Sequence, residues 1–398
     1  MTDNRAGTPG KRFSGMLKST LLFILMLVVA FAMIEGIAAT ALFGYDLFSS
    51  LMRTTLRSSI YTEADNLLGW RTIPNLYLPD VFAPGQEFRS NDQGFRNAQH
   101  ISAARPPNSI RAVCSGDSFT LGQGVSNANT WCSMFATARP DVESANLGLS
   151  GYGIGQAYLR YCRDAAGVAH DIHIFAPITD DFRRMQLAKF VGANKPYFTV
   201  KDGALSLENV PVPETSRLAV WWTLNSGVFT ELRSAQFINK LIARLSGPHR
   251  PATGSATRPG KQAFRELAWK ILEQVYETTT ARNAKLVLVY LPEQATPMRE
   301  GEDWRRLMEA FAAEHNVTFV DIYSHVHRLP VEQRVKLYSP VWEHFSVAGN
   351  QLVSDLIWAA LGKDWQPPLP QHPVPDEPDT ALCPTAALQG RGTETPDE

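Results

Sequence analysis

The sequence predicts an α/β fold, a three-layer sandwich with a five-stranded and mostly parallel sheet, preceded by one N-terminal transmembrane helix. Two observations predict the sandwich. Short apolar runs rich in β-branched residues alternate with longer runs of helical periodicity, and 44% of the 398 residues are hydrophobic, enough to bury a sizeable core. The third observation is a single long apolar run near the N-terminus.

That apolar run, Leu21–Phe43, has one charged residue, Glu35, and is as long as the roughly 20 residues that a helix needs to cross a bilayer. We expect a cytoplasmic N-terminus at 1–18 and a transmembrane anchor at 19–43. Basic residues before the run place the rest of the chain outside the cytoplasm by the positive-inside rule; they are Arg5, Lys11, Arg12 and Lys18. A cleaved signal peptide is the alternative, although the run exceeds the usual signal core.

Five apolar runs are expected to form the sheet, and four helical runs are expected to cover it. The strands are Ile110–Cys114, Val142–Asn146, His170–Ala176, Lys285–Leu291 and Val317–Ile322. The helices are Gly155–Asp164, Gln262–Thr279, Trp304–Ala313 and Val347–Leu361. This alternation is typical of a parallel sheet with helices on both faces, and the order of the strands stays open.

The core domain is expected at 108–365, after an extracytoplasmic linker and N-terminal extension at 44–107. An insertion at about 183–260 interrupts it and carries a hairpin signal around Asp202–Gly203, followed by a helical pattern and a flexible connector. Because open α/β sheets bind ligands at this edge, the insertion could form a lid or a substrate-binding cap; it could equally pack on the core or on the membrane. The Pro-rich tail at 366–398 is expected to be disordered.

Composition excludes several classes of function. A net charge of −1, without a basic cluster interleaved with aromatic residues, argues against nucleic-acid binding. The four cysteines have no CxxC or Cys/His ligand spacing, so we expect no metal site, and no other cofactor is expected. Outside the cytoplasm they could form disulfides, whose pairing the sequence leaves open.

The stretch "CSGDSFTLGQGV" places Ser118 at a sharp turn directly after the first strand. A serine there is exposed at the carboxyl edge of the sheet, and the helix behind it directs backbone N–H groups toward the same point. Such a setting suits a nucleophile, whereas a simple helix cap is the alternative. Asp117 precedes the serine and is expected to stabilise the turn.

Three later blocks end at the same edge. "NLGLSGYGIGQ" follows the second strand with glycines whose amides can approach a ligand closely. Asp180 and Asp181 follow the third strand, and His344 precedes the last helix. Together with the serine, these blocks form the arrangement of a nucleophile, a base and oxyanion donors.

In the order of these blocks, the chain resembles the SGNH, or GDSL, hydrolases over about residues 108–362. The block "GDSF" would carry the nucleophile Ser118, "NLGLSGYG" would supply Gly151 as a backbone donor to the oxyanion, and the last block would supply His344 as the base. The stretches "SNDQGFR", "GDSFTLGQGV", "NLGLSGYGIGQ" and "YLRYCRD" are similar to a bacterial membrane-anchored subgroup of this family.

The resemblance implies a flavodoxin-like SGNH fold and an anchor in the bacterial inner membrane, with the domain in the periplasm. It implies a serine esterase that acts on acylated, notably acetylated, carbohydrate or lipid of the cell envelope, without a cofactor. Transfer of the acyl group to a surface polysaccharide is one alternative. A catalytically degenerate protein that binds a carbohydrate or an envelope assembly partner is the other.

The first departure from the family pattern is Asp180, which stands where the family has an asparagine whose amide donates to the oxyanion. An ionised carboxylate would oppose the developing negative charge, and only a protonated one could donate. Burial and the neighbouring Asp181 could keep it protonated. Otherwise Asp180 is structural, or it binds substrate together with Arg183 or Arg184.

The second departure concerns the imidazole of His344. The family has an aspartate two or three residues earlier that orients the ring, but here Trp342 and Val341 occupy those places. Glu343 is adjacent in sequence, and neighbouring residues of an extended chain point in opposite directions. A bent loop could bring Glu343 to the ring, or a backbone carbonyl could fix its tautomer and leave a Ser–His dyad.

Overall fold

The computed structural model describes residues 18–37, 40, 60–215, 261–294, 298–341, 343–362, 364–367 and 383–384. Lys18–Ile37 forms a helix of 20 residues with a mean hydropathy of 2.5, long and apolar enough to cross a membrane. Its length and composition fit either a membrane anchor or a signal sequence. The last residues of the predicted anchor, 41–43, lie outside the described residues.

The predicted five-stranded sheet is confirmed, and its strands are all parallel. The strands are β5 (Ile110–Gly116), β6 (Val142–Asn146), β7 (Ile172–Ala176), β12 (Lys285–Tyr290) and β13 (Thr318–Asp321), in the spatial order β13-β12-β7-β5-β6. By position in the chain this is the order 2-1-3-4-5 of the flavodoxin-like sheets. From β5 the chain first adds β6 on one side and then β7 on the other, so the strand order switches between β5 and β7. Sheets of this kind form their ligand crevice at such a switch point.

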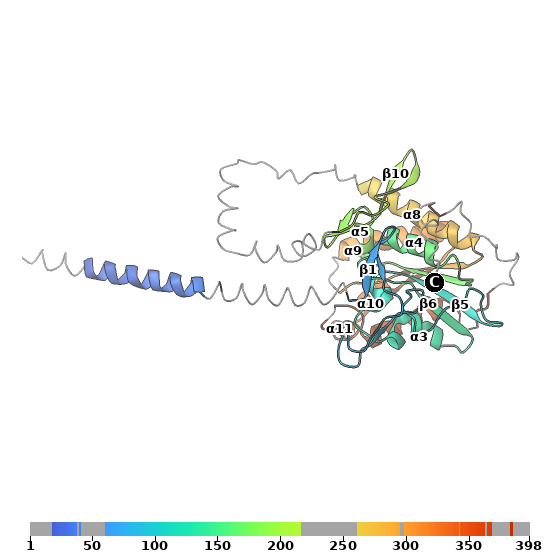
Figure 1. The fold of residues 1–398 in the computed structure, drawn as a ribbon, viewed down its shortest axis with the longest axis horizontal. Helices are drawn as coiled ribbons and strands as arrows, with labels where there is room; N and C mark the ends of the chain where they lie inside the picture. Colours follow the sequence, from blue (N-terminus) through green and yellow to red (C-terminus); the bar gives the residue numbers. More distant parts are fainter. Residues whose placement is uncertain are drawn as a thin grey trace, which may run out of the picture. The chain divides into compact units, whose positions relative to one another are not determined.

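Helices cover both faces of the sheet, as the sequence predicts (Figure 1). One face packs against α3 (Trp131–Thr137) and α12 (Val347–Leu361); the other packs against α4 (Ile154–Asp164), α8 (Lys261–Ala281) and α9 (Met298–Glu314). Alternate strand residues enter opposite cores, since successive side chains of a strand point to opposite faces. On β12, for example, Val287 joins the α3/α12 core and Leu288 joins the α4/α8/α9 core.

The described residues before the sheet, 60–107, contribute side chains to its core. Two antiparallel pairs lie in this extension: β1 (Thr62–Asp65) with β2 (Gly69–Thr72), and β3 (Tyr77–Leu78) with β4 (Phe88–Arg89). Tyr61, Leu68 and Phe88 are buried in the α4/α8/α9 core. The described part of the extension, 60–107, therefore belongs to the domain.

The insertion after β7 begins with α5 (Thr179–Arg184) and continues as two hairpins. These are β8 (Lys189–Phe190) with β9 (Ala193–Asn194), and β10 (Tyr197–Lys201) with β11 (Ala204–Glu208). The predicted turn at Asp202–Gly203 is confirmed, because Lys201 pairs with Ala204. The predicted helical pattern and the connector that follow lie outside the described residues. The remaining elements are α2 (Ser118–Leu121), the 3₁₀-helix η1 (Asn127–Asn129), α10 (Ile322–Arg328) and α11 (Val331–Lys336).

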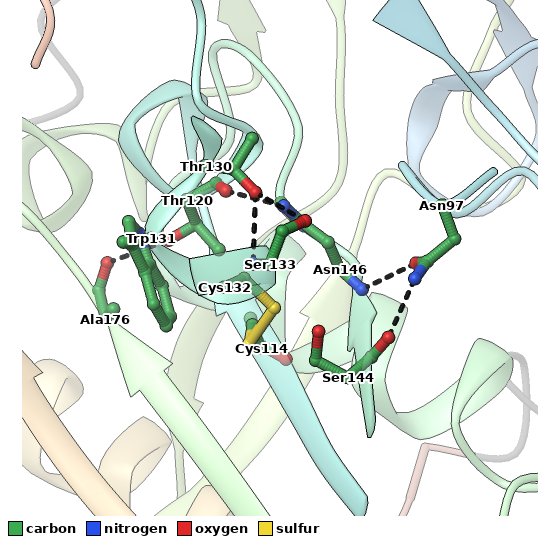
Figure 2. Close-up of a disulfide and its surroundings, with 12 residues drawn as sticks. Asn97, Cys114, Thr120, Thr130, Trp131, Cys132, Ser133, Ser144, Asn146 and Ala176 are labelled. Atoms are coloured by element: carbon green, nitrogen blue, oxygen red, sulfur yellow. Dashed lines mark hydrogen bonds between the residues drawn. A yellow bond between two sulfur atoms is a disulfide. The ribbon is translucent and has the colours of Figure 1, made fainter. Parts of the chain in front are cut away.

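All four cysteines form disulfides, Cys114 with Cys132 and Cys162 with Cys383. The first bond joins the strand that leads to Ser118 to α3, as Figure 2 shows. The second fixes a residue of the C-terminal tail on α4, and Cys383 is buried there. The sequence left this pairing open, because the two cysteines are 221 residues apart.

Arg96, from the extension, holds the end of α2 from inside the protein. Its guanidinium donates hydrogen bonds to the carbonyl oxygens of Leu121 at 2.5 Å, Gly122 at 2.6 Å and Val125 at 2.5 Å. Burial lowers the pKa of Arg96 to about 9. A buried guanidinium is tolerated only where acceptors surround it, and these carbonyls supply them directly behind Ser118.

Replacing Arg96 with methionine should destabilise the protein by about 3 kcal/mol, because three buried carbonyl groups lose their donor. Urea unfolding of the detergent-solubilised full chain, followed by tryptophan fluorescence, measures this change. The control Arg89→Met, at a half-exposed arginine paired with Glu87, should leave the stability nearly unchanged, because exposed ion pairs contribute little. Equal stability of the Arg96 variant and wild type would contradict this role.

Candidate active site

Ser118 and His344 meet at the carboxyl edge of the sheet. Ser118 begins α2 directly behind β5, and its Oγ lies 2.7 Å from Nε2 of His344, in the loop before α12. The Ser118 residue is 7% exposed, so its hydroxyl is largely shielded from bulk water. The two residues that the sequence proposes as nucleophile and base are therefore in hydrogen-bond contact, although 226 residues separate them in the chain.

The loop of His344 is held against the α3/α12 core. The Phe119 ring lies 4.6 Å from the imidazole, centroid to centroid, and the His344 carbonyl accepts a 2.7 Å hydrogen bond from the Ser339 N–H. Buried Asn350 donates to the Ser346 carbonyl at 3.0 Å and accepts from the Trp131 N–H at 2.9 Å. The start of α12 is thus fixed to α3, and α3 is tied to β5 by the Cys114–Cys132 disulfide (Figure 2).

Asn146, at the end of β6, links the nucleophile helix to the glycine-rich loop. Its side-chain amide donates to the Thr120 carbonyl at 2.9 Å, and its Oδ1 accepts from the Gly148 N–H at 3.0 Å. The loop approaches α2 so closely that a Cβ on Gly148 would lie 2.2 Å from the Leu121 nitrogen. Only glycine fits there, which explains one of the glycines in this block.

Gly151 lies in the same loop with φ +81°, a conformation that favours glycine. The extension fixes this turn: the Trp70 indole N–H donates to the Ser150 carbonyl at 3.0 Å, and the Tyr61 hydroxyl lies 3.0 Å from Ser150 Oγ. Among the described residues, none accepts a hydrogen bond from the backbone N–H of Ser118 or of Gly151. Both N–H groups are thus without an acceptor among the described residues.

Arg184 lies between two buried carboxylates behind the serine. Its Nη1 is 3.4 Å from Asp117 Oδ2 and 3.1 Å from Asp181 Oδ1. Asp117 caps α2 by accepting from the Phe119 N–H at 2.9 Å, and its Oδ2 lies 3.3 Å from Ser118 Oγ. Burial raises the pKa of Asp117, and burial together with the charge of Asp117 raises the pKa of Asp181 well above its ordinary value.

Asp180 pairs with two arginines. One carboxylate oxygen is 3.3 Å from Arg183 Nη1, and the other is 2.5 Å from Arg184 Nη2. Both oxygens therefore accept from guanidinium groups. The Asp180 N–H donates to Glu293 at 3.2 Å, which brings a further carboxylate to this strand end.

Glu343 does not approach the imidazole. Its side chain is exposed, its φ is 57°, and within the described part of the chain no hydrogen bond joins it to His344. Trp342 lies outside the described residues. The sequence leaves two ways to orient the imidazole, by Glu343 or by a backbone carbonyl. The geometry does not favour Glu343.

Sequence reasoning missed several residues that build this site. Phe119 and Asn350 contact segments that are distant in the sequence, and no local pattern marks them. Arg184 is named from the sequence as a residue that could bind substrate with Asp180; its ion pairs with Asp180, four positions earlier, and Asp181, three positions earlier, follow from helical spacing. In the residues that the structure describes, no group of three or more His, Cys, Asp or Glu side chains could hold a metal ion.

Comparison with known proteins gives likeness to solved structures only, since no family model and no curated protein matches the chain. A lipase/acylhydrolase from Enterococcus faecalis is 13% identical, with 66% of this chain and 100% of that one covered, at a TM-score of 0.38. A member of the lipolytic protein G-D-S-L family from Veillonella parvula is 14% identical, with 63% and 97% covered, at 0.36. A GDSL-like lipase from Bacteroides thetaiotaomicron is 15% identical, with 65% and 92% covered, at 0.35. Likeness of this degree does not establish membership of a family or an activity.

Replacing Asp181 with asparagine should change how stability depends on pH. The folded-state pKa of Asp181 is raised, so the folded state binds its proton more tightly than the unfolded state, and wild-type stability is lost as pH rises from about 4 through the folded pKa. The asparagine lacks this titration. Urea unfolding between pH 4 and 7 should show the free energy of unfolding of wild type falling relative to that of Asp181→Asn. A pH-independent difference would contradict the raised pKa.

Proposed function

We propose that this protein is a serine esterase of the SGNH type, with Ser118 as the nucleophile and His344 as the base. The observation that carries the proposal is the 2.7 Å contact between Ser118 Oγ and His344 Nε2 at the ligand-binding edge of the sheet. The backbone N–H groups of Ser118 and Gly151, which have no acceptor among the described residues, supply donors for an oxyanion.

The reaction proceeds in two halves. His344 Nε2 takes the proton of Ser118 as Oγ attacks the ester carbonyl carbon, and the carbonyl oxygen becomes an oxyanion that accepts hydrogen bonds from the two N–H groups. The imidazolium then gives its proton to the departing alcohol, which leaves an acyl-enzyme on Ser118. Water, deprotonated by His344, attacks this acyl-enzyme, and the carboxylic acid is released as the serine regains its proton.

In a complete triad a carboxylate contacts the base, whereas here a buried carboxylate, that of Asp117, lies next to the nucleophile. Asp117 is buried next to Ser118, and its carboxylate attracts the imidazolium that forms during attack. Loss of the orienting aspartate in a triad costs about 10⁴ in turnover. We therefore expect turnover well below that of an enzyme with a complete triad.

We further propose that the enzyme acts outside the cytoplasm, anchored in the inner membrane, on acylated carbohydrate or lipid of the envelope. Two disulfides support an oxidising compartment, and the apolar helix Lys18–Ile37 supports attachment to a membrane. The names of the similar solved structures, which include lipases and an acylhydrolase, agree with an ester substrate. If a hydroxyl group of a surface polysaccharide attacked the acyl-enzyme in place of water, the acyl group would pass to the polysaccharide and the protein would be a transferase.

A binding protein without catalysis is the second candidate, and Asp180 is the observation that favours it. The carboxylate stands where the family pattern places an amide donor, and Arg183 and Arg184 engage both of its oxygens. A site with fewer oxyanion donors stabilises the transition state less, because one donor contributes about 10² to 10³ in turnover. The candidates differ in whether Ser118 turns over an ester.

Hydrolysis of p-nitrophenyl acetate by the detergent-solubilised full chain separates the two candidates. Wild type should hydrolyse the ester, and Ser118→Ala or His344→Ala should each lower kcat/KM by about a thousandfold or more, because each removes one half of the proton-transfer pair. The controls Ser102→Ala and His100→Ala, at exposed residues of the extension, should leave the rate unchanged. Wild type that hydrolyses the ester no faster than Ser118→Ala would favour the binding protein.

A further inference from the structure

Two aromatic side chains that no part of the proposed mechanism uses lie against Gly151. A Cβ built on Gly151 would lie 2.9 Å from Cε1 of Phe190 and 3.3 Å from Cζ2 of Trp70. Phe190 comes from β8 of the insertion, and Trp70 comes from β2 of the extension. Segments about 120 residues apart therefore converge on one of the two N–H groups offered to the oxyanion.

Both rings are held in place. The Phe190 ring lies between Gly151 and the Arg184 guanidinium, whose carbon is 4.6 Å from the ring centroid. Trp70 donates to the Ser150 carbonyl at 3.0 Å, and its own carbonyl accepts from the Tyr152 hydroxyl at 2.6 Å. Neither ring can leave the neighbourhood of Gly151 without losing these contacts.

The hairpin that carries Phe190 is itself tightly fixed. Val191 and Gly192 close it with φ values of 48° and 82°, the two positive values that a tight hairpin turn requires, although a valine rarely adopts such a φ. The Asn194 carbonyl lies 2.5 Å from the place of a Cβ on Gly69, so β9 packs directly on the strand of Trp70. Trp70 and Phe190 thus belong to one rigid wall.

Gly151, against which the two rings lie, and His344 are next to residues of different cores. Leu149 and Tyr152, around Gly151, are part of the α4/α8/α9 core, whereas Phe119 and Phe345, around His344, are part of the α3/α12 core. The departing alcohol must lie next to His344, because the imidazolium protonates it. The acyl group is then directed toward Gly151, where the two rings lie.

We propose that Trp70 and Phe190 form the wall that contacts the acyl group and restricts it to short chains, an inference that rests on the proposed esterase function. With its carbonyl oxygen at the Gly151 N–H, an acetyl group ends before the rings, whereas a longer chain runs into them. Phe190 is the residue that sets this limit, since its ring is nearest to Gly151. The substrate class is therefore an acetyl ester.

The test compares kcat/KM of the detergent-solubilised full chain for p-nitrophenyl butyrate and for the acetate. Wild type should prefer the acetate. Phe190→Ala should raise the butyrate-to-acetate ratio about tenfold or more, because it opens the space that the added methylenes need, and Phe190→Leu should raise it less. The matched control is Tyr197→Ala, on the face of β10 opposite the buried Phe198, and it should leave the ratio unchanged.

Each result of this experiment decides the question. The proposal would be overturned if the butyrate-to-acetate ratio stayed at the wild-type value in both Phe190 variants, or if wild type preferred butyrate. Should Phe190→Ala fail to fold, the ratio in Phe190→Leu carries the test, because leucine keeps an apolar side chain against Arg184. Wild type inactive on both esters would instead overturn the proposed function, and the inference with it.

Discussion

The structure of this site depends on one hydrogen bond across the edge of the sheet, between Ser118 Oγ and His344 Nε2. The serine is fixed from the α2 side, where Arg96 holds the carbonyls at the end of that helix and Asn146 holds Thr120. The histidine is fixed from the α12 side, through Asn350 and the contact with α3. Because the Cys114–Cys132 disulfide joins β5 to α3, the two halves of the pair share one rigid support.

The electrostatics of the site centre on Arg184, whose guanidinium contacts Asp117, Asp180 and Asp181. Buried carboxylates persist only where a charge or several donors compensate them, and Arg184 is that compensation. Asp117 joins this cluster to the serine. The chain thus places its negative charge next to the nucleophile, whereas the family pattern places an aspartate shortly before the base.

The sheet was largely predictable from the sequence, because a buried parallel strand is a short apolar run and needs no distant information. The boundaries of β6 and α12 match those expected, and β5 extends two residues further, to Gly116. Ser118 and His344 were predictable as a pair only through the order of the blocks. The positions of Phe190 and Trp70 were not predictable, since each reaches Gly151 through packing between the extension and the insertion. The pairing of Cys383 was left open for a similar reason: its partner, Cys162, is 221 residues away.

The most direct test of the central claim is the site at which a fluorophosphonate reacts with the full-length protein. One adduct is expected by peptide mass spectrometry, on Ser118, because its hydroxyl lies 2.7 Å from the His344 imidazole at the ligand-binding edge of the sheet. The adduct should form far more slowly in His344→Ala and at the wild-type rate in Glu343→Gln. An adduct on another serine, or a Ser118 adduct that forms equally fast without His344, would contradict the account.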